Sequence, residues 1–142
     1  MAMKRILVPV DGSDVALRAL RVAAQRARAL QAELHVLHVE PPMHYEEIRV
    51  YVVREDLEKF RQEACQRVLA AAAQALAAEK VAHVEHLRQG EVAQTIAQVA
   101  DSQGMDEVVM GTRGMGALGT LLLGSVAYRV VHLVHVPVTL VK

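Results

Sequence analysis

Five short segments dominated by apolar residues are spaced along the chain, and charged or turn-forming residues follow each one. They cover residues 5–10, 33–39, 81–87, 106–111 and 136–141. Nearly continuous apolar runs of this length are typical of strands buried on both faces, as in parallel sheets. The pattern therefore predicts five strands.

Between these runs, apolar residues recur every three or four positions, which is the spacing of one helix face. Ser13 or Asp14 can cap the first helix, because a short side-chain oxygen accepts hydrogen bonds from its first amides. The predicted helices follow residue 13, cover residues 56–79, include residues 92–100 and begin again at Ser125. Residues 43–55 alternate like a strand but have flanks that would suit a helix, so we leave them as an insertion of unknown shape.

Strands and helices thus alternate from one end of the chain to the other. Strict alternation predicts an α/β fold, a parallel sheet with helices on both faces, because each crossover must be right-handed. With 142 residues, the expected organisation is one domain covering residues 1–142.

Charge and composition narrow the classes of partner. Sixteen basic residues balance sixteen acidic ones, so the chain lacks the net positive field of nucleic-acid and membrane-surface binders. No apolar run approaches the roughly 20 residues that span a bilayer. Cys65 is the only cysteine, which excludes an internal disulfide and favours a reducing compartment. We expect a cytoplasmic protein that binds neither nucleic acid nor membrane.

The segment after the fourth predicted strand carries the most chemical information. Five glycines fall within the fourteen residues from Gly111 to Gly124, and a helix follows at Ser125. Glycines let backbone amides approach an anion closely, and a helix start adds unpaired N–H groups. Arg113 could add positive charge and Ser125 a hydroxyl donor. The alternative is a plain connecting loop in which Gly124 and Ser125 only start the helix.

Two standard phosphate-binding motifs do not fit this segment. Gly114, Gly116 and Gly119 have the spacing of the dinucleotide fingerprint, but Thr139 and Leu140 stand where its acidic residue should be. The Gly-Lys-Ser/Thr motif of P-loop NTPases is absent, because no lysine precedes Ser125. Motor or switch NTPase chemistry is therefore not expected.

Another pattern fits better. Gly111, Gly114, Gly124 and Ser125 have the spacing Gly-x-x-Gly, nine residues, Gly-Ser. In this motif the chain resembles the universal stress proteins, specifically their ATP-binding branch. Residues 6–13 and 136–141 are similar to the first and last strands of that family.

The resemblance implies a sheet order of 3-2-1-4-5, with the ligand crevice where strands one and four separate. It places Pro9 and Asp11 along ATP, with Asp11 near the ribose hydroxyls or a nucleotide-bound Mg²⁺ or Mn²⁺. It gives Val39 a backbone contact with adenine. The residues that it assigns to ribose and phosphates are Gly111, Thr112, Arg113, Gly114, Met115, Gly116, Gly124, Ser125 and Val126. It also implies a homodimer paired through Val136 to Val141.

Asp11 has an alternative role as a turn residue in Asp-Gly-Ser-Asp, and Val39 could be core alone. Histidines three apart on predicted strands, such as His35 and His38, point to opposite faces and cannot share an ion. His132 and His135 share a predicted helix face without a third ligand. Asp106 and Glu107 resemble a solvated edge, and no nucleophile–base set can be assembled.

Three functions stay open at this point. The first is an ATP-binding regulator or sensor in the stress response. The second is a dimeric interaction protein that binds no nucleotide. The third is an ATP hydrolase, which would be slow at most.

Overall fold

The computed structural model describes residues 2–42, 54–113 and 123–142. Within these ranges, strands and helices alternate as the hydrophobic pattern predicts. Their bounds are β1 Arg5–Pro9, α1 Asp14–Leu30, β2 Glu33–Glu40, α2 Arg54–Glu79, β3 His83–Gln89, α3 Val92–Ser102, β4 Glu107–Gly111, α4 Ser125–Leu133 and β5 Val138–Val141.

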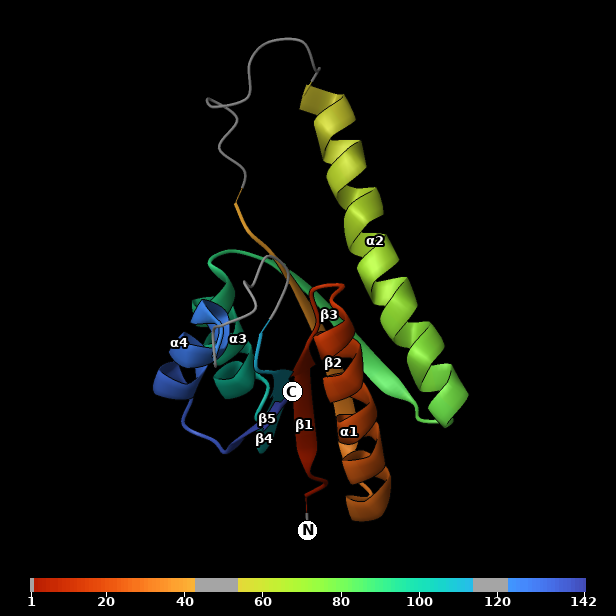
Figure 1. The fold of residues 1–142 in the computed structure, drawn as a ribbon, viewed down its shortest axis with the longest axis vertical. Coiled ribbons are helices and arrows are strands. Elements are labelled where there is room, and N and C mark those ends of the chain that lie inside the picture. The colour runs from red at the N-terminus through yellow and green to blue at the C-terminus, as the bar shows by residue number, and fades with distance from the viewer. Residues whose placement is uncertain (1, 43–53, 114–122) are drawn as a thin grey trace.

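The strands form one parallel sheet in the order β3-β2-β1-β4-β5, which confirms the predicted α/β architecture. Helices α1 and α2 cover one face, and α3 and α4 cover the other (Figure 1). A hydrophobic core lies on each face of the sheet, and alternate residues of β1 belong to one or the other. Ile6 and Val8 pack toward α1 and α2, and Leu7 packs toward α3 and α4. The sheet is thus buried on both faces at its centre.

Several element boundaries differ from the sequence prediction. Helix α2 begins at Arg54 rather than residue 56, and its first turns extend beyond the sheet (Figure 1). Strand β3 begins at His83, because Lys80 takes a left-handed conformation and the Val81 N–H still donates to Leu76 O of α2. Residues 43–53 of the insertion lie outside the described residues. No helix in the described part of the chain is long and apolar enough to cross a membrane.

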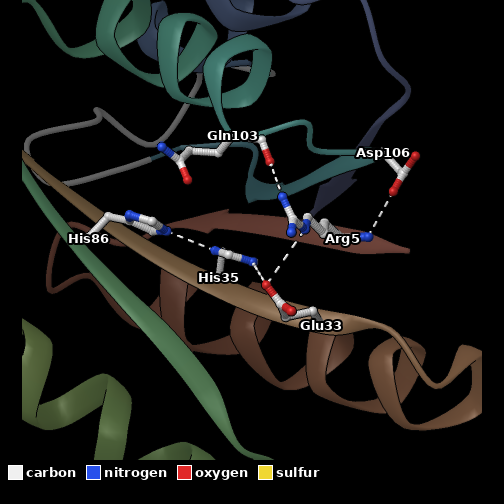
Figure 2. A network of polar contacts seen from close by, with 6 residues as sticks. All are labelled: Arg5, Glu33, His35, His86, Gln103 and Asp106. Carbon is white, nitrogen blue, oxygen red and sulfur yellow. Dashed lines mark hydrogen bonds and ion pairs between the residues drawn. The ribbon is translucent and has the colours of Figure 1, made fainter. Parts of the chain in front are cut away.

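A network of polar side chains joins the amino ends of the strands (Figure 2). The Arg5 N–H donates to Asp106 at 2.8 Å, and its guanidinium donates to Gln103 O and lies 3.7 Å from Glu33. His35 bonds to Glu33 through one ring nitrogen and to His86 through the other, at 2.8 Å. The polar side chains of this network therefore find their hydrogen-bond partners within the protein.

Glu107 does not belong to a solvated edge, so that expectation was wrong. Its carboxylate is buried in β4, where it accepts from Arg26 of α1 at 2.8 Å and from Thr139 of β5 at 2.7 Å. A buried charge needs such partners, because removal from water is otherwise costly. Asp106, one residue earlier, is exposed.

Candidate functional site

A cavity of about 480 Å³ opens at the carboxyl ends of β1, β2 and β4. This is the point where the chain order of the strands reverses in the sheet, and ligands of open α/β sheets bind there. Its size falls within the range of small-molecule sites. The lining residues are Pro9, Val10, Asp11, Ala16, Leu37, His38, Val39, Pro41, Val92, Ile96, Met110, Gly111, Arg113, Gly124, Ser125, Val126 and Ala127.

The turn between β1 and α1 presents Asp11 to this cavity. The Asp11 carboxylate accepts from the Ser13 N–H at 2.9 Å and from its hydroxyl at 2.6 Å. The Ser13 hydroxyl oxygen in turn accepts from Ala16 N–H and caps α1, so of the two predicted caps, Ser13 and Asp14, it is Ser13 that serves. Gly12 has a φ of 89°, which favours glycine. Asp11 is thus a turn residue, and the same turn holds it at the cavity.

Gly111 ends β4 beside this turn, at a position that has no room for a side chain. Its φ is not positive, but a Cβ there would lie 2.5 Å from Val15 Cγ1 and 3.1 Å from Arg113 O. Only glycine therefore lets the end of β4 pack this closely against α1.

Thr112, which follows Gly111, is buried and is not among the lining residues. Its N–H donates to Val141 O at 2.8 Å, and its carbonyl accepts from Gly124 N–H at 2.6 Å. Those bonds fasten the two ends of the Gly-rich segment together and place Gly124 at the cavity.

The start of α4 differs from the starts of α1 and α3. Gly124 is its N-cap residue and has no side chain that could accept hydrogen bonds from the first amides, and no other side chain among the described residues does so. In contrast, Glu91 caps α3, and the hydrogen bond from Gln94 N–H is the main cause that lowers the pKa of the Glu91 carboxyl. The first N–H groups of a helix lack partners within it. At α4 the residues that carry them, 125–127, line the cavity.

The end of β2 also presents backbone groups to the cavity. The Val10 N–H donates to Leu37 O, on the β1 side, and Gly90 N–H donates to Glu40 O, on the β3 side. Peptide groups alternate in direction along a strand, so the Val39 N–H and C=O point toward β1. Strand β1 ends at Pro9, which leaves them facing the space beyond it.

The structure brings most of the predicted site residues together. Pro9, Asp11, Val39, Gly111, Arg113, Gly124, Ser125 and Val126 all line the cavity. Thr112 does not, since its backbone is used to anchor the segment. Gly114, Met115 and Gly116 lie outside the described residues.

The sequence prediction missed the apolar walls and one histidine. Val92 and Ile96 of α3 form a wall with Leu37 and Met110, and His38 joins them at the end of β2. The apolar spacing predicts a helix that includes residues 92–100, but helical spacing does not tell a core face from a cavity wall. No pattern in the sequence marked His38 as a lining residue.

Metal ligation can be judged only for the described residues, among which no cluster of three or more His, Cys, Asp or Glu side chains is placed to hold an ion. The expectation that His132 and His135 share a helix face was wrong. His35 meets His86 across strands, and His135 lies beyond the end of α4 rather than on a helix face with His132. Asp11 is the one carboxylate among the described lining residues, so an ion here would need ligands from a bound molecule.

Comparison with known proteins agrees with this fold. The family model described as "Universal stress protein family" matches residues 3–142. A universal stress protein of Thermus aquaticus is 39% identical over 140 residues, which cover 98% of each chain.

Two solved structures are similar in fold and name a ligand. A universal stress protein in complex with cAMP has 26% identity and a TM-score of 0.74, over 100% of this chain and 99% of that one. The universal stress protein from Archaeoglobus fulgidus in complex with dAMP has 26% identity and a TM-score of 0.73, over 99% and 98%. The chain therefore belongs to the universal stress protein family.

Proposed function

We propose that this protein binds ATP in the cavity and acts in the cytoplasm as a nucleotide-dependent regulator or sensor in the stress response. The observation that carries the proposal is the convergence of three features on one cavity. They are the uncapped start of α4, the Asp11 carboxylate and the backbone of Val39. The complexes of similar proteins with cAMP and dAMP support an adenine nucleotide as the ligand class.

The end of the cavity near β2 suits the base. Leu37, Val92 and Ile96 supply apolar surface for a flat ring, and the Val39 peptide groups supply one donor and one acceptor. Adenine offers an acceptor at N1 beside a donor at N6, which matches an N–H and C=O pair. Guanine presents the opposite order on the same edge. We therefore expect adenine to be preferred over guanine.

The opposite end of the cavity suits phosphates. Gly124 and Ser125 begin a helix whose first amides have no side-chain cap, and such a helix start attracts anions. Arg113 lines the same end and adds positive charge. In the proposed complex the Asp11 carboxylate contacts the ribose hydroxyls or a Mg²⁺ or Mn²⁺ held by the phosphates. We expect hydrolysis to be slow at most.

Calorimetric titration with ATP, AMP and GTP tests this proposal. We expect saturable binding of ATP and weaker binding of GTP. Asp11→Asn removes the charge and should weaken ATP binding by about 10-fold, whereas Asp14→Asn, in the first turn of α1, serves as the matched control. If no nucleotide binds, the alternative of a dimeric interaction protein gains support. Many turnovers per minute would instead favour the hydrolase.

We further propose a homodimer through the last strand. Strand β5 lies at the sheet edge, and Leu140 is exposed on it. An unpaired apolar edge invites pairing with another chain, and a two-fold partner would cover it. Light scattering should give twice the mass of one chain. Leu140→Asp should shift that mass toward the monomer, and an unchanged mass for the variant would argue against this interface.

A further inference from the structure

His38 lies at the end of β2, one residue before Val39, and has no role in the site proposed above. Its side chain is half-buried and lines the cavity. Its Nδ1 lies 2.8 Å from the carbonyl oxygen of Val10, at the end of β1. A carbonyl oxygen can only accept, so Nδ1 carries the proton and donates it.

This bond takes the place of the next backbone hydrogen bond between β1 and β2. The β1–β2 ladder continues as far as the Val10 N–H, which donates to Leu37 O at 2.8 Å. In a regular parallel ladder the Val39 N–H would then donate to Val10 O. The described residues show no such backbone bond, and the His38 imidazole takes that acceptor instead.

Two consequences follow for the cavity. Val10 is held through both its N–H and its carbonyl, and Asp11 is the next residue, so the position of the Asp11 carboxylate depends on this anchor. The Val39 N–H is also released from the ladder and stays available to a ligand. One side chain thus fixes two groups on which the proposed nucleotide site depends.

We propose that His38 is a positioning residue that ends the β1–β2 ladder and keeps the crevice open for the nucleotide. The proposal rests on the nucleotide-binding function for its effect on affinity. It also makes a prediction for the free protein, because the state of the Val39 amide does not require a ligand. The two claims can therefore fail separately.

Three substitutions of His38 test whether the hydrogen bond to Val10 O matters, rather than the size of the side chain. The side-chain amide of Asn reaches the place of Nδ1, whereas that of Gln reaches the place of Nε2. His38→Asn should therefore retain the bond to Val10 O, and His38→Gln and His38→Ala should lose it. We expect ATP affinity to fall roughly 5- to 10-fold in the Gln and Ala variants and to stay within about 2-fold in the Asn variant.

Amide hydrogen exchange measured by NMR, without nucleotide, provides the second readout. In the wild type and in His38→Asn the Val39 amide should exchange fast, and in His38→Ala it should become protected by pairing with Val10 O. Val36, within the β2 ladder, is the reference amide. Slow exchange of Val39 in the wild type, or equal affinity in all three variants, would overturn the proposal. If the wild type binds no ATP but the exchange pattern holds, the nucleotide function fails and the ladder role stands.

Discussion

Polar groups at the amino ends of the strands bond to other protein groups, whereas several at the carboxyl ends face a cavity. At the amino ends, Glu33, His35 and His86 are joined to one another, and buried Glu107 has partners on α1 and β5. At the carboxyl ends, no described side chain caps the start of α4, and the Val39 peptide faces a cavity. Polar groups without protein partners cost free energy when buried, so they persist where a ligand or water can supply the partners.

The comparison teaches that stability and binding are located at different ends of the same strands. Substitutions at the amino ends should lower the free energy of unfolding and leave nucleotide affinity intact. Substitutions at the carboxyl ends should do the reverse, except where packing or helix capping coincides with the site, as at Gly111 and Ser13.

The largest loss of stability is expected for Glu107→Ala. This change leaves Arg26 and Thr139 without their acceptor in a part-buried site and should cost about 2–3 kcal/mol. Urea unfolding followed by circular dichroism measures the loss, and Glu63→Ala on the exposed surface of α2 is the control. If Glu107→Ala also changed ATP affinity by more than 2-fold, stability and nucleotide binding would not depend on separate ends of the sheet.

The next prediction compares Gly111, at the carboxyl end of β4, with Gly104, which precedes the amino end of β4. Gly111→Ala should cost about 1–3 kcal/mol, because the new Cβ would overlap Val15, and should also weaken ATP binding. Gly104→Ala, at a φ of 63°, should cost about 1 kcal/mol through backbone strain alone. Its ATP affinity should equal that of the wild type, and equal losses of affinity in both variants would contradict the comparison.

Two serines at helix starts should have smaller and opposite effects. Ser13 caps α1, so Ser13→Ala should lower stability by about 1 kcal/mol. Ser125 begins α4 without capping it, so Ser125→Ala should leave stability unchanged and weaken ATP binding about 3-fold. Thermal unfolding and calorimetry on the same samples test both claims. A less stable Ser125→Ala protein would give this hydroxyl a structural role.

The smallest effect is the pH dependence of the amino end. Burial, followed by the positive charges of His35 and Arg88, lowers the pKa of His86 from the ordinary value of 6.5. The unfolded chain then binds the proton more tightly, so this contribution to stability is complete above about pH 6.5 and is lost as the pH falls. Glu33, bonded to His35, is the nearby acidic group.

His86→Gln retains a donor near His35 but does not titrate, so its stability should fall less between pH 7 and pH 5 than that of the wild type. His132→Gln, on the exposed surface of α4, is the control. Identical acid profiles for wild type and His86→Gln would show that another group governs the acid response.

The sequence by itself determined the elements of the fold, because hydrophobic periodicity and helix caps are local properties. The five apolar runs, a cap at Ser13 or Asp14 and the helix start at Ser125 could all be predicted. The resemblance to a known family supplied the strand order and eight of the seventeen described lining residues. The predicted boundaries were off by up to two residues, as at β3, where the left-handed Lys80 ends α2.

Only the tertiary structure decided which polar side chains meet. His38 and Val10 are 28 residues apart, His35 and His86 are 51 apart, and Arg26 and Glu107 are 81 apart. Each contact depends on strand order and register, to which a single side chain contributes little. The same long-range packing sets the burial of Glu107 and the anchoring of Thr112. Local spacing carries no record of such contacts, because they form only when distant strands are aligned.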